Sequence, residues 1–434
     1  MQKISENQAI LLTSVVAVTI AIGFIFSILF FGLLHNRAPL TKQQYDPSLQ
    51  GSYEKDLKIE MVTEGLSYPT SMAFVDESKI LVLEKNTGLV RLISDGVLQN
   101  KPVLRLPIDN KAERGLLGIA VLHKNNNKTD VVNTNVYLYF TESNNKSNSN
   151  LRNDEQVRNM IYKYDWNGQS IINPTLILDL PAIPGPYHNG GKLVIGPDHY
   201  LYTVIGDLGG PKTEAQNNKT GPAADGTGGI LRTTQDGKPV SDPPLGNKYP
   251  LSLYYAYGIR NSFGIGFDPV TGKLWDTENG EDKYDEINVV KPGFNSGWFT
   301  VMGPLSRNNI SKAELVNLPG SYYSDPVFSW YHDVGVTDIE FLKSSKLGEK
   351  YKNNIFVGDI NNGNLYYFQL NDTRTGLKFN SSGLKDMVVD NNDDLSDIIF
   401  ASGFRGITDI KTGLDGYLYI LSYLDGKLYR IVPN

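Results

Sequence analysis

The sequence predicts an all-β protein, a six-bladed β-propeller preceded by a single N-terminal transmembrane helix. Three observations support this fold class. From about Leu57 to the C-terminus, short apolar runs alternate with turn residues, and no long stretch shows helical spacing. One strand–turn–strand unit recurs along this region. A long apolar run without charged residues lies near the N-terminus.

The composition narrows the classes of function. The chain has 434 residues, of which 40% are hydrophobic, so it can bury a large core. Its net charge of -6 offers no basic surface for a nucleic acid. Because the chain has no cysteine, disulfides, thiolate metal sites and cysteine nucleophiles are excluded.

The apolar run extends from Ala9 to Leu34 and carries no charged residue. It exceeds the roughly 20 residues that span a bilayer as a helix and the roughly 7–15 residues of a signal-peptide core. We therefore expect a retained membrane anchor over residues 1–35, with a cleaved signal as the alternative. Residues 36–56 are polar, contain two prolines and predict a tether to a propeller over 57–434.

The expected location of the propeller is outside the cytoplasm, on the cell surface. The anchor predicts this location, and a set of Asn-x-Ser/Thr sequons in polar stretches makes a glycosylated protein plausible. The sequons lie at Asn127, Asn145, Asn218, Asn309, Asn371 and Asn380.

The repeated unit reads strand, Asp/Gly turn, strand. Copies begin at Met72, Leu193, Ile265 and Ile407, with a looser copy from Asn353. The copies are roughly 40–70 residues apart, which is typical of a propeller with long loops. The alternative is a set of unrelated hairpins in a sandwich or barrel.

Glycine-marked stretches interrupt the repeats, and in a propeller such loops gather at one end of the central channel. His188 lies in one of them, Tyr187–Leu193. An imidazole titrates near neutrality and can take a proton from an alcohol, whereas a histidine that only caps a turn is the alternative. The neighbouring Gly190 and Gly191 predict a close approach by another group.

Two further stretches carry candidate binding groups. Arg260 and Asn261 offer a guanidinium for a carboxylate and an amide for hydrogen bonds, or else a structural ion pair. The acidic segment Glu278–Glu286 suits Ca²⁺, which takes oxygen ligands flexibly, although a solvated acidic turn is the alternative. Neither a phosphate-binding glycine loop nor a GxSxG nucleophile elbow is present.

At these stretches the chain resembles the soluble quinoprotein sugar dehydrogenases, the glucose, sorbosone and aldose sugar dehydrogenase family. The resemblance runs from about Ser67 to the C-terminus. It is strongest at ERGLLGIA, HNGGKLVIGPDHYLYTVIGD, YGIRNSFGIGFDPVTGKLW and DEINVVKPGFNSGW. It implies a six-bladed propeller that holds pyrroloquinoline quinone (PQQ) and Ca²⁺. It also implies oxidation of a sugar at its anomeric hydroxyl, with an external electron acceptor.

The resemblance also implies roles for individual residues. His188 matches the general base, and Arg260 and Asn261 match residues that hold the quinone. The remaining positions are expected to face the cofactor or its calcium ion. They are Glu113 and Asn189 for the cofactor and Gly280, Glu281 and Glu286 for the metal.

Several positions depart from the family pattern, chiefly where cations are expected to hold the carboxylates of PQQ. Gly406 and Thr408 replace two arginines, with Arg405 next to them, and Asn361 replaces a lysine. Glu113 replaces a glutamine and Tyr187 an aspartate. Two hypotheses follow. The first is a membrane-anchored PQQ-dependent sugar or alcohol dehydrogenase. The second is a non-catalytic propeller that has lost PQQ and binds a glycan or a protein partner.

Overall fold

A computed structural model describes residues 46–123, 134–143, 157–379 and 383–434. The propeller unit spans residues 47–434 and consists of strands with a few short helices. The described helices are η1 (Gly51–Lys55), η3 (Glu214–Gln216), η4 (Leu251–Leu253), η5 (Leu305–Arg307), η6 (Lys312–Glu314) and α2 (Asn392–Ser396).

Strand pairing in the described ranges gives six separate sheets, which we number along the chain. Sheet 1 contains β3 (Pro69–Phe74), β4 (Lys79–Glu84), β5 (Leu89–Ser94), β6 (Val97–Leu98) and β7 (Leu104–Arg105). Sheet 2 contains β8 (Leu116–His123), β9 (Thr134–Ser143), β10 (Val157–Trp166) and β11 (Ile171–Pro181). Sheet 3 contains β12 (Leu193–Ile195), β13 (Leu201–Ile205), β14 (Gly229–Thr233), β15 (Tyr254–Tyr257), β19 (Phe294–Asn295) and β20 (Tyr322–Tyr323).

The second half of the chain forms the other three sheets in the same way. Sheet 4 contains β16 (Gly264–Phe267), β17 (Leu274–Glu278), β18 (Asp285–Val290), β21 (Phe328–Trp330) and β26 (Val388–Val389). Sheet 5 contains β22 (Val336–Phe341), β23 (Ile355–Asp359), β24 (Leu365–Leu370), β25 (Leu377–Lys378), β27 (Ile399–Ser402) and β1 (Ser48–Leu49). Sheet 6 contains β28 (Ile407–Thr412), β29 (Leu418–Ser422), β30 (Lys427–Pro433) and β2 (Leu57–Glu64).

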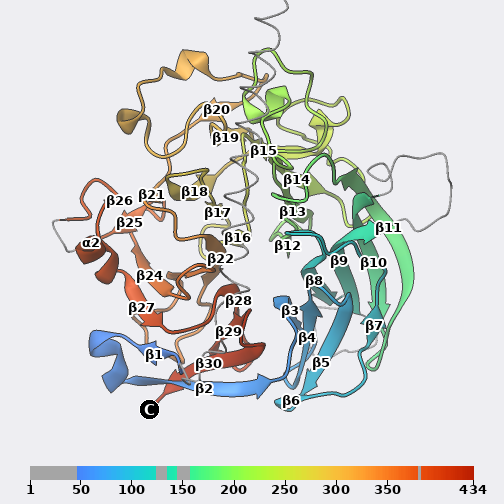
Figure 1. The fold of residues 1–434 in the computed structure, drawn as a ribbon, viewed down its shortest axis with the longest axis vertical. Helices are drawn as coiled ribbons and strands as arrows, with labels where there is room; N and C mark the ends of the chain where they lie inside the picture. Colours follow the sequence, from blue (N-terminus) through green and yellow to red (C-terminus); the bar gives the residue numbers. More distant parts are fainter. Residues whose placement is uncertain (1–45, 124–133, 144–156, 380–382) are drawn as a thin grey trace, which may run out of the picture. The chain divides into compact units, whose positions relative to one another are not determined.

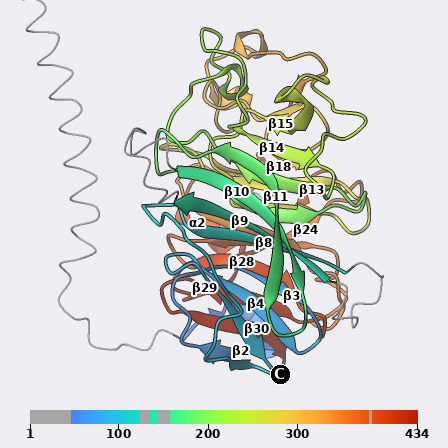
Figure 2. The ribbon, with the colours of Figure 1, turned by 90° about the vertical axis from the view of Figure 1, so that its right-hand side faces the viewer.

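The first strands of the six sheets form a closed ring. Strands β3, β8, β12, β16, β22 and β28 contact one another in this order, and β28 returns to contact β3 (Figure 1). Strand β2 pairs antiparallel with β30, so the beginning of the propeller completes the last sheet. In Figure 1, β8, β9, β10 and β11 of sheet 2 follow one another outward from the ring, and Figure 2 looks onto this side of the molecule. The predicted all-β propeller is confirmed.

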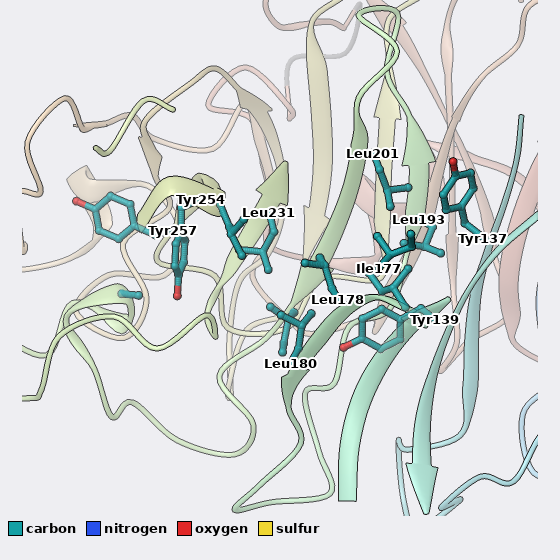
Figure 3. Close-up of a cluster of buried hydrophobic side chains, with 14 of the residues drawn as sticks. Tyr137, Tyr139, Ile177, Leu178, Leu180, Leu193, Leu201, Leu231, Tyr254 and Tyr257 are labelled. Atoms are coloured by element: carbon teal, nitrogen blue, oxygen red, sulfur yellow. The ribbon is translucent and has the colours of Figure 1, made fainter. Parts of the chain in front are cut away.

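The hydrophobic core is divided among the interfaces between consecutive sheets. One buried cluster joins sheets 2 and 3, where Tyr139 and Leu178 lie near Leu193 and Leu231 (Figure 3). Comparable clusters occupy the other five interfaces of the ring. Each sheet therefore buries both of its faces against its neighbours, which explains the runs of consecutive buried residues in the inner strands.

The repeated turn has the same chemistry in four sheets. Asp76, Asp198, Asp268 and Asp415 each accept a hydrogen bond from the backbone N–H two residues further on. This local bond closes an Asx turn between the first and second strands of the sheet. The recurring aspartate in the sequence is thus explained by turn formation.

The N-terminal boundary of the propeller differs from the sequence prediction. Part of the expected tether belongs to the propeller, because β1 pairs with β27 and Gln50 N–H donates to Phe400 O at 3.0 Å. The ring of Tyr53 packs on Phe400 with centroids 4.4 Å apart. Leu49 and Tyr53 are apolar residues in a polar stretch, and they cover the outer strand of sheet 5. The expected anchor, Ala9–Leu34, lies outside the described residues. Within those residues, no helix has the length and apolar character required to cross a bilayer.

Candidate active site

His188 lies in the loop between β11 and β12, with its backbone in the left-handed region at φ 58°. The two glycines that follow it are required by packing within the protein. A Cβ on Gly190 would lie 2.5 Å from Val204 O, and one on Gly191 would lie 2.6 Å from Leu117 Cβ. The close approach that these glycines predicted is therefore made by β13 and β8, which fix the position of His188.

The imidazole of His188 is oriented by a buried carboxylate. Its Nδ1 lies 2.5 Å from Oδ1 of Asp207, which follows β13 and is 1% exposed. Asp207 also accepts hydrogen bonds from Gly209 N–H at 2.8 Å and from Trp298 Nε1–H at 2.8 Å. Burial opposes the ionised form of Asp207, but the bond from His188 and the other donors hold its pKa below the ordinary value. An ionised Asp207 favours the tautomer with the proton on Nδ1, which leaves the lone pair on Nε2.

Glu113 connects the His188 loop to the loop before β16. Its Oε2 accepts the backbone N–H of His188 at 2.7 Å and Nδ2–H of Asn261 at 3.3 Å. Asn261 is 4% exposed, and its Oδ1 lacks a hydrogen-bond partner in the part of the chain that is described. Loops from sheets 2, 3 and 4 thus meet at one carboxylate, and one amide oxygen remains able to accept a bond.

Arg260 contacts the residues that hold His188 in place. Its carbonyl accepts Asp207 N–H at 2.9 Å, and its guanidinium lies 5.3 Å from the ring of Trp298. Nη1 donates to Asn279 O at 3.2 Å, and no ion pair of Arg260 occurs within the described ranges. Trp298 therefore touches both the carboxylate that orients His188 and the guanidinium of Arg260. The contacts place His188, Arg260 and the turn at Asn279 side by side.

The three predicted metal positions have different surroundings. Gly280 follows Asn279, and its N–H donates to Asp285 Oδ1 at 3.0 Å, while the Glu281 side chain is exposed. Glu286 is 1% exposed on β18, and its Oε1 accepts Gly303 N–H at 2.5 Å. No three acidic or histidine side chains among the described residues are arranged to hold a metal ion. A calcium ion at this turn would therefore depend mainly on backbone carbonyls.

The side chain of Asn189 forms hydrogen bonds with sheet 2 and with the loop that follows it. Its Nδ2–H donates to Pro186 O at 2.9 Å, and its Oδ1 accepts from Asn159 at 3.1 Å. Asn189 is 0% exposed. The structure thus gives it a role in holding the loop, and its side chain does not line the cavity described next.

A cavity of about 240 Å³ opens at this end of the channel. Glu113 and Gly190 line it, so the His188–Asp207 pair lies beside it. Hydroxyl-bearing side chains contribute to its wall, together with two lysines and three large apolar residues, Leu117, Phe263 and Ile360. Besides Glu113, its polar lining residues are Thr70, Ser71, Lys85, Lys192, Thr337, Thr408 and Tyr423.

Beneath this cavity, four charged side chains from the inner strands and the loop before β12 form what we call the channel cluster. Lys192 Nζ lies 2.6 Å from Asp338 and 2.5 Å from Asp409. Lys411 Nζ lies 3.1 Å from Asp338 and 3.2 Å from Asp409. All four charges are paired, and Met72 N–H donates a further bond of 2.6 Å to Asp409. The formal charges of the channel cluster therefore cancel.

Sequence reasoning missed Asp207, Trp298 and the channel cluster. Asp207 ends the strand–turn–strand unit that contains His188, and a carboxylate directly after an apolar strand was an available signal. Asp409 and Lys411 lie two residues apart in the inner strand β28, which places both charges on one face. Trp298 gave no signal, because its contact with Asp207 joins positions 91 residues apart.

The fold and the site define a β-propeller with a histidine–aspartate pair at the mouth of its central channel. Residues 66–430 match the family model of glucose/sorbosone dehydrogenases. The chain belongs to this family, and the resemblance predicted from the sequence motifs is confirmed.

Individual relatives agree with this assignment. Quinoprotein glucose dehydrogenase B of Acinetobacter calcoaceticus is 30% identical over 283 residues, which cover 61% of this chain and 56% of that protein. A putative oxidoreductase (glucose dehydrogenase) of Thermus thermophilus superposes with a TM-score of 0.66 at 25% identity. The match covers 87% of this chain and all of that structure. The PQQ-bound aldose sugar dehydrogenase of Streptomyces coelicolor gives a TM-score of 0.63 at 22% identity over 90% of this chain and all of that structure, a likeness of fold.

Proposed function

We propose that this propeller oxidises a sugar, or a related alcohol, with PQQ as the hydride acceptor and His188 as the general base. The observation that carries the proposal is the His188–Asp207 pair beside the channel cavity. Asp207 fixes the tautomer of His188, so Nε2 can take the proton of a substrate hydroxyl while hydride leaves the carbon that bears this hydroxyl. Asp207 then stabilises the imidazolium that forms.

Two residues of the His188 site, Asn261 and Arg260, do not line the cavity themselves but offer groups that suit a polar, anionic cofactor. Asn261 Oδ1 and Arg260 Nε are buried atoms without a hydrogen-bond partner among the residues described. Arg260 also has no carboxylate partner there, so its charge is available to a ligand. Arg260, Asn261 and Glu113 would hold PQQ, which when bound supplies a two-electron acceptor. The relatives named above include a quinoprotein and a PQQ-bound enzyme.

We place Ca²⁺ at the turn of Gly280 and Glu281, next to the Asn279 carbonyl that Arg260 contacts. Carbonyl oxygens of a tight turn are ligands that calcium accepts. Glu286 is not assigned as a ligand, because its carboxylate accepts hydrogen bonds from Gly303 N–H and Asn288 Nδ2–H.

The test is reconstitution of the purified full-length chain with PQQ and Ca²⁺, followed by aldose-dependent reduction of a redox dye. We expect activity in the wild type and a loss of about 100-fold or more in His188→Gln, the range expected for removal of a general base. His199→Gln is the matched control, because His199 lies in the turn before β13. Absence of aldose-dependent reduction in the PQQ-loaded wild type contradicts the proposal.

A second candidate function is a propeller that binds a glycan or protein partner without PQQ. It is favoured by the run from Arg405 to Asp409. Arg405 is half exposed and lies 3.6 Å from Asp425, Thr408 Oγ1 donates to Pro69 O, and Asp409 belongs to the channel cluster. This run therefore supplies no cation to the cavity. Failure of the wild type to bind PQQ at micromolar concentration, together with glycan binding that saturates, would favour this candidate.

We also propose that the charge-free run Ala9–Leu34 anchors the propeller at the outer surface of the cell membrane, where an external acceptor receives the electrons. The length of the run supports this proposal. The test is protease treatment of intact cells. Cleavage of the propeller without lysis is expected, and full protection would contradict the location.

A further inference from the structure

Lys85 is a buried cation in the wall of the channel cavity, directly after β4. The residue is 8% exposed and lines the cavity beside Glu113 and Thr70. Its ammonium donates to Ala112 O at 2.6 Å and to Asn86 Oδ1 at 3.0 Å, both neutral oxygens. It forms no ion pair with any carboxylate in the described part of the chain. Since an ammonium has three donors, one remains for a ligand.

The other cations near the cavity are occupied or directed elsewhere. Lys192 also lines the cavity, but Asp338 and Asp409 neutralise it. Arg405, the cation adjacent to the run where the family pattern has arginines, has a 54% exposed side chain beside Asp425 and does not line the cavity. Of these three cations, Lys85 is the one that is buried in the cavity wall and forms no ion pair with a carboxylate.

The backbone around Lys85 fixes where its side chain lies. Lys85 N–H donates to Tyr68 O at 3.1 Å, and Lys85 O accepts Leu116 N–H at 3.1 Å. Gly115 lies against it so closely that a Cβ there would stand 2.5 Å from Lys85 O and 2.8 Å from Lys85 Cγ. The ammonium is thus held by sheets 1 and 2 together, which is the preorganisation that a binding group requires.

We propose that Lys85 binds a carboxylate of the cofactor and thereby replaces the cationic contacts that Gly406, Thr408 and Asn361 do not supply. This inference rests on the proposed function and identifies the residue that makes a polycarboxylate acceptable to the cavity. Burial lowers the pKa of Lys85 to about 8, although the charges of Glu113 and Asp109 oppose this shift. A carboxylate bound to Lys85 would raise the pKa of this lysine again, so the charged lysine and the carboxylate favour each other.

The experiment compares Lys85→Met, Lys85→Arg and Arg405→Met with the wild type in the full-length chain. Calorimetry measures the Kd of PQQ with Ca²⁺, and of benzene-1,3,5-tricarboxylate, a redox-inactive probe. We expect Lys85→Met to raise both Kd values about 10- to 100-fold, the effect of one charge-assisted hydrogen bond. Lys85→Arg keeps the charge, so it should raise both Kd values less than Lys85→Met does. Arg405→Met should leave both Kd values within about twofold of the wild type. Circular dichroism confirms that the variants are folded.

A second measurement uses only the wild type, in case Lys85→Met does not fold. Reductive methylation of lysines is followed by mass spectrometry with and without the tricarboxylate, and Lys85 is expected to be protected while Lys101 is not. Equal affinities in a folded Lys85→Met, or no protection of Lys85, would overturn the inference. If the tricarboxylate binds through Lys85 but no sugar is oxidised, the inference stands and the proposed function fails. If the wild type and a folded Lys85→Met oxidise a sugar equally well and bind the tricarboxylate equally well, the proposed function stands and the inference fails.

Discussion

Two buried groups of carboxylates in the same ring have opposite electrostatics. The channel cluster contains two aspartates and two lysines. A second group, here named the acidic cluster, lies on β17 and β18 of sheet 4 and forms no ion pair with lysine or arginine among the described residues. Strand register brings its members together, with Glu278 opposite Glu286 and Asp276 two residues before Glu278 on the same face. The acidic cluster comprises Asp276, Glu278 and Glu286.

The titration of the two groups follows from their partners. Burial opposes ionisation of Asp338, but Lys192 and Lys411 hold its pKa well below the ordinary value. In the acidic cluster, burial raises the pKa of Glu278 to about 7, and burial followed by the charge of Glu278 raises that of Asp276. In the channel cluster itself, burial raises the pKa of Asp409 to about 6 against the charges of Lys192 and Lys411. The contrast with the acidic cluster therefore lies in Asp338, whose pKa the same two cations lower despite complete burial.

Removing a cation from the channel cluster is the strongest test of this comparison. Lys192→Met leaves two buried aspartates with one ammonium, and we expect it to destabilise the propeller by about 3–5 kcal/mol. Urea denaturation measures the change, and Lys343→Met, at an exposed lysine, is the control. Addition of Asp409→Asn to Lys192→Met should recover part of the loss. A cost below about 1 kcal/mol would show that the cluster does not depend on its cations.

Asp207 is a third kind of buried carboxylate, paired with an imidazole at the cavity. Asp207→Asn removes the charge that fixes the His188 tautomer, and we expect kcat for sugar oxidation to fall about 100-fold. Binding of PQQ, measured by calorimetry, should change less than about threefold, because Asp207 does not line the cavity. Loss of PQQ binding with unchanged kcat would instead assign Asp207 to the cofactor.

Neutralising a carboxylate of the acidic cluster should stabilise the propeller, whereas Lys192→Met should destabilise it. Asp276→Asn removes a buried charge without a cationic partner, and we expect a gain of about 1–2 kcal/mol at about pH 8 in a chelating buffer. A carboxyl whose folded pKa is raised makes the protein less stable as pH rises from the unfolded value of about 4 through the folded value. The gain should therefore shrink toward about pH 5, as urea denaturation at both pH values would show. An equal loss of stability at both pH values would contradict the assignment.

An exposed network gives the smallest expected effect. Arg307 pairs with Asp386 at 2.5 Å and with Asp390 at 2.7 Å, and its side chain is 30% exposed. Because solvent screens this network, Arg307→Met should cost about 0.5–1 kcal/mol. The same denaturation assay measures it, and about 0.5 M salt should reduce the difference. A cost equal to that of Lys192→Met would remove burial as the cause of the contrast.

The fold and part of the site could be predicted from the sequence because their signals lie in neighbouring residues. Asx turns and alternating strands are written in neighbouring residues, so the repeats beginning at Met72 and Ile407 were readable. His188 and Arg260 stood out because they interrupt those repeats. Their partners did not stand out, because the bonds to Asp207 and Trp298 and the burial of Lys85 depend on which loops the ring brings together. The same limit applies to Asn189, whose side chain is used in sheet 2.

In the proposed reaction, the imidazole held by Asp207 removes a proton while a sugar gives hydride to PQQ. The most direct measurement is anaerobic mixing of the PQQ-loaded full-length chain with excess aldose, followed by absorbance of the cofactor. We expect reduction of the cofactor by the wild type and a rate about 100-fold lower in His188→Gln with equal PQQ loading. Reduction at the same rate in His188→Gln, or no reduction by any aldose, would contradict it.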